Sequence, residues 1–220
     1  MKTYKKSLRF ILALVMGMFF RTVESEASVI TYTSRVGWET AVSGSSIFNE
    51  DFESFLVDTE FRTVTVDVGH FTLRQIGTGL SFRNLIEAPP FEYEDNNGTK
   101  HASMFTEFDS PIKVEMAFHH PIFAWGANFY DASENEKLNL DLVLDMGGVI
   151  TTIPVPVNTG FFGFVTSPQE NVGKLIFKSR TSLTAGEGFG LDNISGAVPE
   201  PVTVLLLGLG GLGLLRKRRA

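Results

Sequence analysis

Four acidic residues in two short segments are the strongest candidates for site chemistry. Glu50, Asp51 and Glu53 lie close together, and Asp192 lies far along the chain. If the two segments form neighbouring strands, these carboxylates converge with backbone carbonyls on one hard cation. Calcium takes about six to eight oxygen ligands and suits carboxylates in flexible loops. The four residues are therefore a predicted calcium site; the alternative is that they face water while apolar neighbours fill the core.

A polar loop supplies a second candidate site. Residues Glu92–Lys100 place acidic, amide and glycine residues around a single tyrosine, which is typical of an exposed loop. Sugar recognition combines flat aromatic rings with amide and carboxylate groups that hydrogen-bond to hydroxyls. We therefore predict ligand contacts for Tyr93, Glu92 and Asn97.

Catalytic motifs are missing from the sequence. The chain has no cysteine, which excludes thiolate nucleophiles and thiolate metal sites. Its histidines lack the spacing of zinc enzymes, and no Gly-x-Ser-x-Gly elbow occurs. A glycosidase needs two carboxyl groups ~5 to ~9.5 Å apart, and Glu107, Asp109 and Glu115 are the candidates for such a pair. We predict no catalytic residue and keep a secreted carbohydrate-active enzyme as an alternative.

The elements that must position these residues are strands. Apolar residues alternate with others over Ile112–Phe118 and Leu138–Leu144, the period-two pattern of half-buried strands. Residues Leu138–Val157 form a predicted hairpin, because two glycines at its centre tolerate positive φ. Pro154 and Pro156 cannot donate ladder hydrogen bonds, so the second arm is expected at a sheet edge.

A single short helix is predicted over Arg35–Val42, with Ser34 as its N-cap. About ten short strands with frequent turn signals favour an all-β fold over residues 28–197, a two-sheet β-sandwich of the jelly-roll kind. The residues expected to be buried include Val36, Trp38 and Val42 of the helix, and Trp125 in an apolar run.

The charge is unevenly distributed along the chain. Residues Ser28–Pro199 carry ten basic and 22 acidic residues, a net charge of −12, while both ends are basic. Phosphate recognition needs clustered Lys and Arg, and the ten here are scattered along the sequence. The middle of the chain is therefore not expected to bind nucleic acid.

The amino-terminal segment has the layout of a secretory signal peptide over residues 1–27. Lys2, Lys5, Lys6 and Arg9 precede an apolar run, and small residues follow at Ser25 and Ala27. The run is too short to span a bilayer stably. We predict export across the inner membrane and removal by signal peptidase.

The carboxyl-terminal segment, residues 198–220, joins a short polar motif to a membrane-seeking tail. Pro199, Glu200 and Pro201 precede an apolar run of fourteen residues, Val202–Leu215, which Thr203 alone interrupts. The chain then ends on a basic cluster that the positive-inside rule keeps in the cytoplasm: Arg216, Lys217, Arg218 and Arg219. Since the run is short and rich in glycine, it is expected to anchor the chain in the inner membrane only transiently.

This carboxyl-terminal segment resembles the PEP-CTERM sorting signal of Gram-negative bacteria that make exopolysaccharide. The motif, the apolar run and the basic end occur in the required order. The resemblance implies recognition by an exosortase, which cleaves near Pro-Glu-Pro and transfers the protein toward the cell surface or the extracellular matrix. A plain tail anchor would need no such motif.

The body is loosely similar to carbohydrate-binding jelly rolls and lectin-like sandwiches. The similarity lies in an early aromatic-bearing helix followed by Asn49–Glu53, and in a last strand Gly188–Ile194 that runs into Pro-Glu-Pro. In such proteins the first and last strands are neighbours and their acidic residues often share a structural calcium. The expected function is a non-catalytic, glycan-binding or adhesive module with exopolysaccharide as a partner. A structural protein of the biofilm matrix without a soluble ligand is the alternative.

Overall fold

The computed structural model of this chain describes residues 28–77, 84–88, 98–106, 112–132, 138–144, 147–156, 159–167, 170–179 and 187–199. These residues form one helix, α2 (Arg35–Ala41), and fourteen strands. The strands are β1 (Ser28–Tyr32), β2 (Ser46–Glu50), β3 (Thr59–Glu60), β4 (Val66–Asp67), β5 (Phe71–Ile76), β6 (Leu85–Glu87), β7 (His101–Thr106), β8 (Lys113–Ile122), β9 (Ala124–Tyr130), β10 (Leu138–Leu144), β11 (Val149–Pro154), β12 (Gly160–Ser167), β13 (Val172–Ser179) and β14 (Glu187–Val198).

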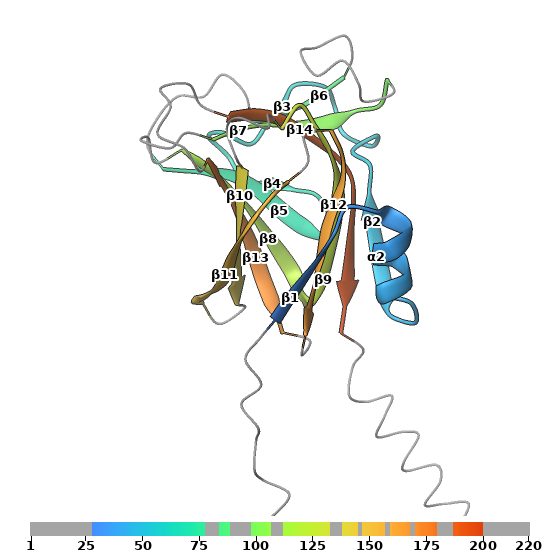
Figure 1. Ribbon diagram of the computed structural model, residues 1–220. Helices are drawn as coiled ribbons and strands as arrows, with labels where there is room; N and C mark the ends of the chain where they lie inside the picture. The colour runs from blue at the N-terminus through green and yellow to red at the C-terminus, as the bar shows by residue number, and fades with distance from the viewer. Residues whose placement is uncertain are drawn as a thin grey trace, which may run out of the picture.

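The strands form two antiparallel sheets that pack face to face (Figure 1). The eight-stranded sheet has the order β1-β12-β9-β14-β7-β6-β3, and β2 pairs with β14 beside this path. The six-stranded sheet has the order β11-β10-β13-β8-β5-β4. The predicted two-sheet, all-β fold is confirmed; its strands outnumber the expected ten because β3, β4 and β6 are only two or three residues long.

The core between the sheets is rich in aromatic rings. Trp125 lies at its centre, fully buried, with its ring centroid 6.0 to 6.3 Å from those of Phe129, Phe164 and Phe177. These residues come from β9, β12 and β13, and so from both sheets. The interleaved rings hold the sheets together without any disulfide, because the chain has no cysteine.

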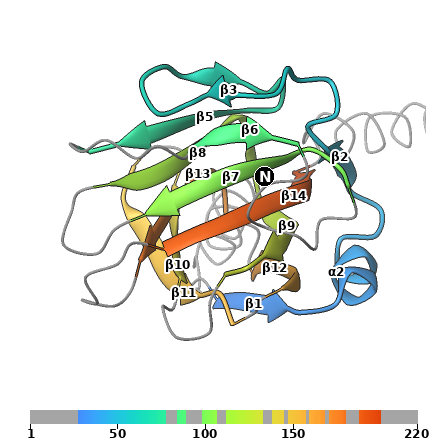
Figure 2. The same ribbon diagram turned by 90° about the horizontal axis from the view of Figure 1, so that it is seen from above.

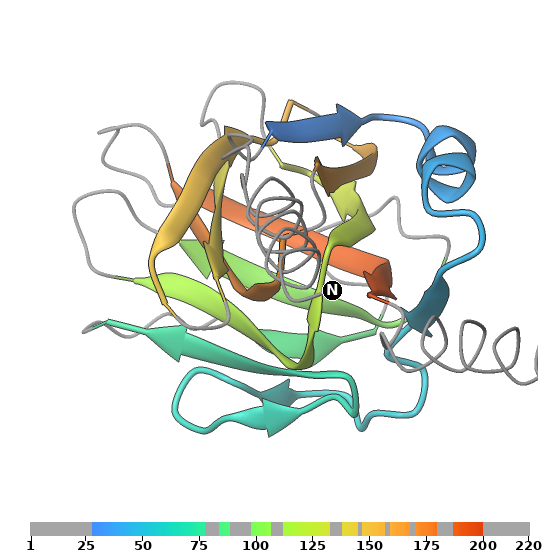
Figure 3. The same ribbon diagram turned by 90° about the horizontal axis from the view of Figure 1, so that it is seen from below.

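Helix α2 packs on the outside of the eight-stranded sheet, beside the edge strand β1 (Figures 2 and 3). The hydroxyl of Ser34 accepts a hydrogen bond from the Gly37 N–H, as predicted for an N-cap. Trp38 and Val42 are buried against the sheet, whereas Val36 is 72% exposed, so its predicted burial is wrong. Trp38 and Val42 are four residues apart and so lie on the same face of the helix, which packs on the sheet. Val36 lies on another face.

The predicted hairpin is present at the end of the six-stranded sheet. Strands β10 and β11 pair antiparallel, and β11 is an edge strand that ends at Pro154. Asp145 and Met146, at the tip of the turn, lie outside the described residues. An edge position suits the second arm because proline has no N–H to donate to a further strand.

Strand β14 has a different neighbour along each half of one side. Its first half pairs with β7 and its second half with β2, while β9 pairs along the other side. The change occurs at a β-bulge, where Asp192 faces Asn128 and Ser195 faces Gly126 across the β9 ladder. The extra residue is Asn193, whose φ of 50° is in the left-handed region that asparagine tolerates.

The two ends of the sandwich body lie at one end of the molecule: β1 begins and β14 finishes there (Figure 1). The predicted signal peptide, residues 1–27, and the segment from Glu200 to Ala220 lie outside the described residues. Within the part of the chain that the structure describes, no helix is long and apolar enough to cross a bilayer.

Candidate functional site

The candidate site lies at the β14 bulge, between the end of β2 and the start of β7. Strand β7 pairs with β14 before the bulge, and β2 pairs with it after the bulge. Ile194 pairs with Glu50, the last residue of β2, and Leu191 pairs with Ala102 near the start of β7. The loop that leaves β2 and the residues that enter β7 therefore meet above the bulge residue Asp192. The predicted pairing of the two acidic segments is present.

Asp192 is the buried carboxylate of this junction. Its side chain is fully buried and accepts hydrogen bonds from the Thr99 hydroxyl (2.9 Å) and from the backbone and side-chain nitrogens of Asn193. Burial and, to a smaller extent, the negative charges of Asp51 and Glu53 together raise the pKa of Asp192 to about 6, against these hydrogen bonds. A buried carboxylate in a negative field is the electrostatic setting that a cation relieves.

The loop after β2 is organised by its own carboxylates. Glu50 Oε1 accepts a hydrogen bond from the Phe52 N–H at 2.7 Å, and Asp51 Oδ1 accepts one from the Glu53 N–H at 3.1 Å. Phe52 has a φ of 59° and a fully buried ring, so the turn is fixed by packing as well as by hydrogen bonds. Burial raises the pKa of Glu50.

Lys100 ties this loop to the start of β7. Its N–H donates to Glu53 Oε1 at 2.7 Å, and its ammonium group donates to the backbone carbonyls of Glu53 and Phe55 at 2.8 and 2.7 Å. The carboxylate of Glu53 is therefore partly satisfied by protein. Sequence reasoning assigned no role to Lys100, because a single lysine at the end of a polar loop forms no pattern.

The structure brings three of the four predicted calcium ligands into one electrostatic neighbourhood, since Asp51 and Glu53 both act on Asp192. Glu50 turns its carboxylate back onto the loop backbone. Among the described residues, no three side chains of His, Asp or Glu are grouped closely enough to hold a metal ion.

A small open pocket of about 220 Å³ lies next to this junction. Its lining comes from α2, from the end of β2 with the residue that follows it, and from the β14 bulge, and every lining residue is of a polar type. The lining residues are Arg35, Asn49, Glu50, Asp51, Asn193 and Ser195. We call this the β2–β14 pocket.

Arg35 is the most constrained side chain of the β2–β14 pocket. Its guanidinium donates to Ser195 Oγ (3.1 Å), to Asn128 Oδ1 (3.3 Å) and to the Asn193 carbonyl (2.6 Å). Ser195 in turn donates to Asn49 Oδ1 at 2.7 Å. Burial lowers the pKa of Arg35, but a guanidinium stays charged in any protein.

The sheet surface beneath Arg35 is shaped by two glycines. Gly126 and Gly163 face each other on β9 and β12, and a Cβ on Gly126 would lie 2.4 Å from the Phe161 ring. The absence of side chains lets the Phe161 ring lie over the sheet, and the Arg35 guanidinium stacks on that ring at 4.7 Å from its centroid.

The β2–β14 pocket presents both hydrogen-bond donors and acceptors to a ligand. Asn49 Nδ2, Asp51 Oδ2 and Asn193 Oδ1 make no hydrogen bond to another described residue. An amide donor beside carboxylate and amide acceptors can bind the hydroxyl groups of a sugar, each of which donates and accepts. The pocket is smaller than the ~300 to ~1,000 Å³ of drug-sized sites, so it suits one sugar unit.

The remaining predicted site residues have different outcomes. Tyr93, Glu92 and Asn97 lie outside the described residues, as do Glu107 and Asp109. Trp38 and Trp125 are buried as expected. Glu115, the third candidate for a glycosidase pair, lies on the six-stranded sheet and is bonded to Arg74 and Lys174.

Sequence reasoning missed the pocket residues Arg35, Asn49 and Ser195. Each has an ordinary local role, in the first turn of a helix or in a strand, and they lie far apart in the chain. Only the pairing of β2 with β14 and the packing of α2 bring them together. The asparagine at position 193 was the available signal, because asparagine tolerates the left-handed backbone conformation that this bulge residue adopts.

The fold and the pocket define an all-β, two-sheet sandwich protein with a polar surface pocket. The chain carries a PEP-CTERM protein-sorting motif, which matches residues 197–219. This motif implies export and processing by an exosortase, with a membrane-anchored tail before delivery to the cell surface.

Some solved structures are similar to this chain at low sequence identity. The K2 cleaved adhesin domain of Lys-gingipain has 12% identity and a TM-score of 0.47, with 70% of this chain and 100% of that chain covered. The K1 cleaved adhesin domain of Lys-gingipain from Porphyromonas gingivalis W83 has 9% identity and a TM-score of 0.41, with 70% and 99% covered. The enzymatically active domain of tailspike protein 4 from bacteriophage CBA120 has 13% identity and a TM-score of 0.34, with 60% and 20% covered.

At these TM-scores the likenesses carry no argument about what the chain does. No curated protein matches the sequence. The chemistry of the β2–β14 pocket and the sorting motif are therefore the basis for a functional conclusion.

Proposed function

We propose that this chain is a surface or extracellular-matrix protein that is exported, anchored transiently in the inner membrane and released by an exosortase. The PEP-CTERM motif at residues 197–219 carries this proposal. Signal peptidase removes residues 1–27, and the basic residues Arg216–Arg219 hold the tail in the cytoplasm until cleavage near Pro199, Glu200 and Pro201.

Intact mass measured in the native host tests the sorting step. Replacing Pro199, Glu200 and Pro201 with alanine should leave the tail attached and increase the mass accordingly. Pro154→Ala, a proline of the edge strand β11, is the matched control and should be processed as the unaltered chain is. Equal removal of the tail in both variants would show that the motif does not direct cleavage.

The proposed role of the body is non-catalytic glycan binding, with adhesion as the result. The observation that supports it is the β2–β14 pocket, which combines amide donors, carboxylate acceptors and a stacked guanidinium on a rigid sheet surface. Tyr93, Glu92 and Asn97 are proposed as additional ligand contacts from their composition alone.

We also propose calcium as a structural cofactor of the junction beside the pocket. Asp51, Glu53, Glu50 and Asp192 would hold it after their carboxylates move together around the ion, which requires Glu50 to turn away from the Phe52 N–H. The ion would supply the positive charge that the buried Asp192 carboxylate lacks. The raised pKa of Asp192 supports this choice, because burial and two neighbouring negative charges penalise its ionised form. Bound calcium would order the loop after β2, which lines the pocket.

Binding of the full chain to a panel of glycans, including the exopolysaccharide of the host, tests the glycan proposal. The measurement is made in calcium and in chelator. Arg35→Gln should abolish most of the affinity. Arg62→Gln, which removes a cation that is paired with Glu60 and does not line the pocket, should leave it unchanged.

Each result has a definite meaning. Saturable binding that depends on Arg35 and on calcium would support the proposal for both the pocket and the ion. Binding to no glycan in either buffer would overturn it and favour a structural matrix protein, and turnover of a glycan would favour an enzyme.

A further inference from the structure

The outer face of the six-stranded sheet carries an ordered row of residues that are polar except for one isoleucine. The register places Arg74, Glu115, Ile176, Asp141 and Thr152 side by side across β5, β8, β13, β10 and β11. Their neighbours toward the core, such as Val114 and Met116 on β8, are buried between the sheets. The row therefore points away from the core, on the side of the molecule opposite to α2.

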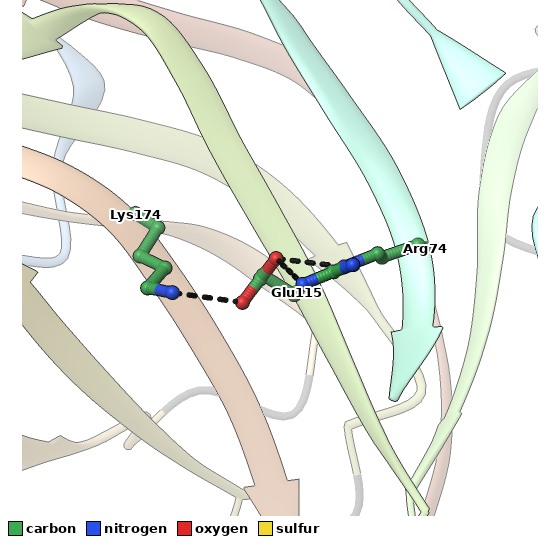
Figure 4. A network of polar contacts seen from close by, with 3 residues as sticks. All are labelled: Arg74, Glu115 and Lys174. Carbon is green, nitrogen blue, oxygen red and sulfur yellow. Dashed lines mark hydrogen bonds and ion pairs between the residues drawn. The ribbon is translucent and has the colours of Figure 1, made fainter. Parts of the chain in front are cut away.

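Glu115 is the first anchor of this row (Figure 4). Its Oε1 accepts from Arg74 Nε at 2.8 Å and is 2.7 Å from a second nitrogen of the same guanidinium, and its Oε2 accepts from Lys174 Nζ at 3.2 Å. One carboxylate from β8 thus holds a cation from each neighbouring strand.

Asp141 repeats this arrangement on the next pair of strands. It is bonded to Lys178 Nζ of β13 at 2.6 Å and accepts a hydrogen bond from the Thr152 hydroxyl of β11. Lys174 and Lys178 are four residues apart on one strand, so their positions are separated by roughly 13 Å along the sheet.

The carboxylates of this face lie beneath the cations. The side chains of Glu115 and Asp141 are 7% and 12% exposed, whereas those of Arg74 and Lys174 are 47% and 36% exposed. An ammonium group has three donors and a guanidinium five, and the contacts to Glu115 and Asp141 use only some of them. The carboxylates therefore fix the cations in place, and the side chains of Arg74, Lys174 and Lys178, which are 27 to 47% exposed, present N–H donors to solvent.

This face contrasts with the charge of the whole body, which is −12 over Ser28–Pro199. Lys113 occupies a further outward position on β8, beside Ile76 of β5. One exposed carboxylate, Asp67, lies at the β4 edge and is paired with His119 at 3.0 Å. The groups named on this face are four cations and three carboxylates, so a diffusing polyanion is repelled less here than over the rest of the acidic body.

We propose that the outer face of the six-stranded sheet, defined by Arg74, Lys174 and Lys178, binds an acidic polysaccharide through its carboxylate groups. Charge complementarity carries this proposal: fixed cations with spare donors face outward in an acidic protein. The surface is separate from the β2–β14 pocket and needs no calcium, so the inference goes beyond the proposed function.

The chemistry of the face favours a polysaccharide over a nucleic acid. Single-stranded nucleic acids bind to aromatic side chains on which the bases stack. The described strand positions on this face carry no Phe, Tyr or Trp. They carry hydroxyl and amide groups instead, namely Thr72, Thr152 and Asn139, which suit the hydroxyl groups of sugar units between the carboxylates.

Retention of the full chain on immobilised alginate, a polymer of uronic acids, tests this proposal. The experiment is done in chelator, so that neither bridging calcium nor the calcium-dependent site contributes, and immobilised dextran serves as the neutral reference. Lys174→Gln and Lys178→Gln should each weaken binding about fivefold or more. Arg62→Gln is matched in charge and should have little effect.

Folding is controlled within the same set of variants. Lys174→Gln leaves the Arg74–Glu115 pair intact, so its melting temperature should stay close to that of the unaltered chain, and Arg35→Gln should keep full binding to alginate. Equal loss in the Lys174 and Arg62 variants would show a general charge effect and overturn the proposal. Equal binding to dextran, or tighter binding to single-stranded DNA than to alginate, would overturn it as well.

Discussion

The guanidinium of Arg35 lies 4.7 Å from the centroid of the Phe161 ring, on the outer face of the eight-stranded sheet. The ring packs over Gly126 and Gly163, and the guanidinium also bonds to the bulge carbonyl of Asn193. The sheet, the helix and the bulge therefore determine together where the positive charge of the β2–β14 pocket lies. Disturbing the surface under the ring should change the pocket without touching any residue that lines it.

Gly163→Ala is expected to destabilise the fold and to weaken the pocket. A Cβ at this position would lie 2.8 Å from the Trp125 carbonyl oxygen and 3.0 Å from Gly126 Cα, both backbone atoms that cannot move aside. The expected loss is about 1–3 kcal/mol in the free energy of unfolding, measured by denaturant titration.

Gly37→Ala is the control for this prediction. Its Cβ would meet only ordinary contacts, the nearest at 3.6 Å from Tyr32. Because alanine favours a helix over glycine, this variant should be more stable by roughly 0.5–1 kcal/mol. A Gly163→Ala variant as stable as Gly37→Ala would contradict the close packing beneath Phe161.

Asp192→Asn should change how stability depends on pH. Burial raises the pKa of Asp192 to about 6 in the folded state from 3.8, so between these values the folded chain binds more protons than the unfolded chain. The stabilising effect of that proton is present at low pH and is lost as the pH rises toward 6, by up to about 3 kcal/mol. The variant should lack this loss.

The measurement is the difference in unfolding free energy between the two chains, in chelator, from pH 4 to pH 7. That difference should shift in favour of Asp192→Asn as the pH rises. Parallel curves for the two chains would show that Asp192 does not titrate with a raised pKa.

Calcium should stabilise the unaltered chain more at pH 7 than at pH 5. An ion at Asp192 needs the ionised carboxylate, so protons compete with it below about pH 6. At a concentration 100 times its dissociation constant, calcium would add ~2.7 kcal/mol. Thermal melting with calcium and with chelator checks this, and a midpoint that calcium leaves unchanged at both pH values would exclude a structural ion.

His101→Gln should reduce the loss of stability at acidic pH. Burial lowers the pKa of His101 below its ordinary 6.5, against a hydrogen bond to the Thr99 backbone that raises it. The unfolded chain therefore binds more protons, and stability is lost as the pH falls below about 6.5. The exposed His120 provides the matched control: His120→Gln should keep the acid sensitivity, and equal flattening in both variants would contradict the prediction.

The spacing of apolar residues, together with capping and turn residues, predicted the local elements well. The helix after Ser34, the β10–β11 hairpin and the buried Trp38 and Trp125 follow from patterns that span fewer than twenty residues. The sequence pattern could not show that Val36 is exposed. A helix of two turns is too short for its pattern to decide which of its apolar residues face the sheet. Local patterns predict which residues are buried. They do not predict whether a residue packs between the two sheets or in the second cluster beneath helix α2.

The site required knowledge of long-range pairing. The acidic segments at Glu50 and Asp192 were predicted to meet, and the pairing of β2 with β14 brings them together. Other features of the site depend on the register between strands that are far apart in sequence. These are the bulge at Asn193, the packing of Phe161 over the two glycines and the position of Arg35. A shift of one residue would turn each of these side chains to the other face of the sheet.

The position of β14 determines how the body resists mechanical load. Hydrogen bonds in an antiparallel ladder run perpendicular to the strands, so a pull along β14 from Pro199 must shear its ladders with β2 and β9 at the same time. While the tail still anchors the chain in the membrane, a pull between the membrane and the body acts in this direction. Such tension would be shared among many hydrogen bonds instead of opening them one by one.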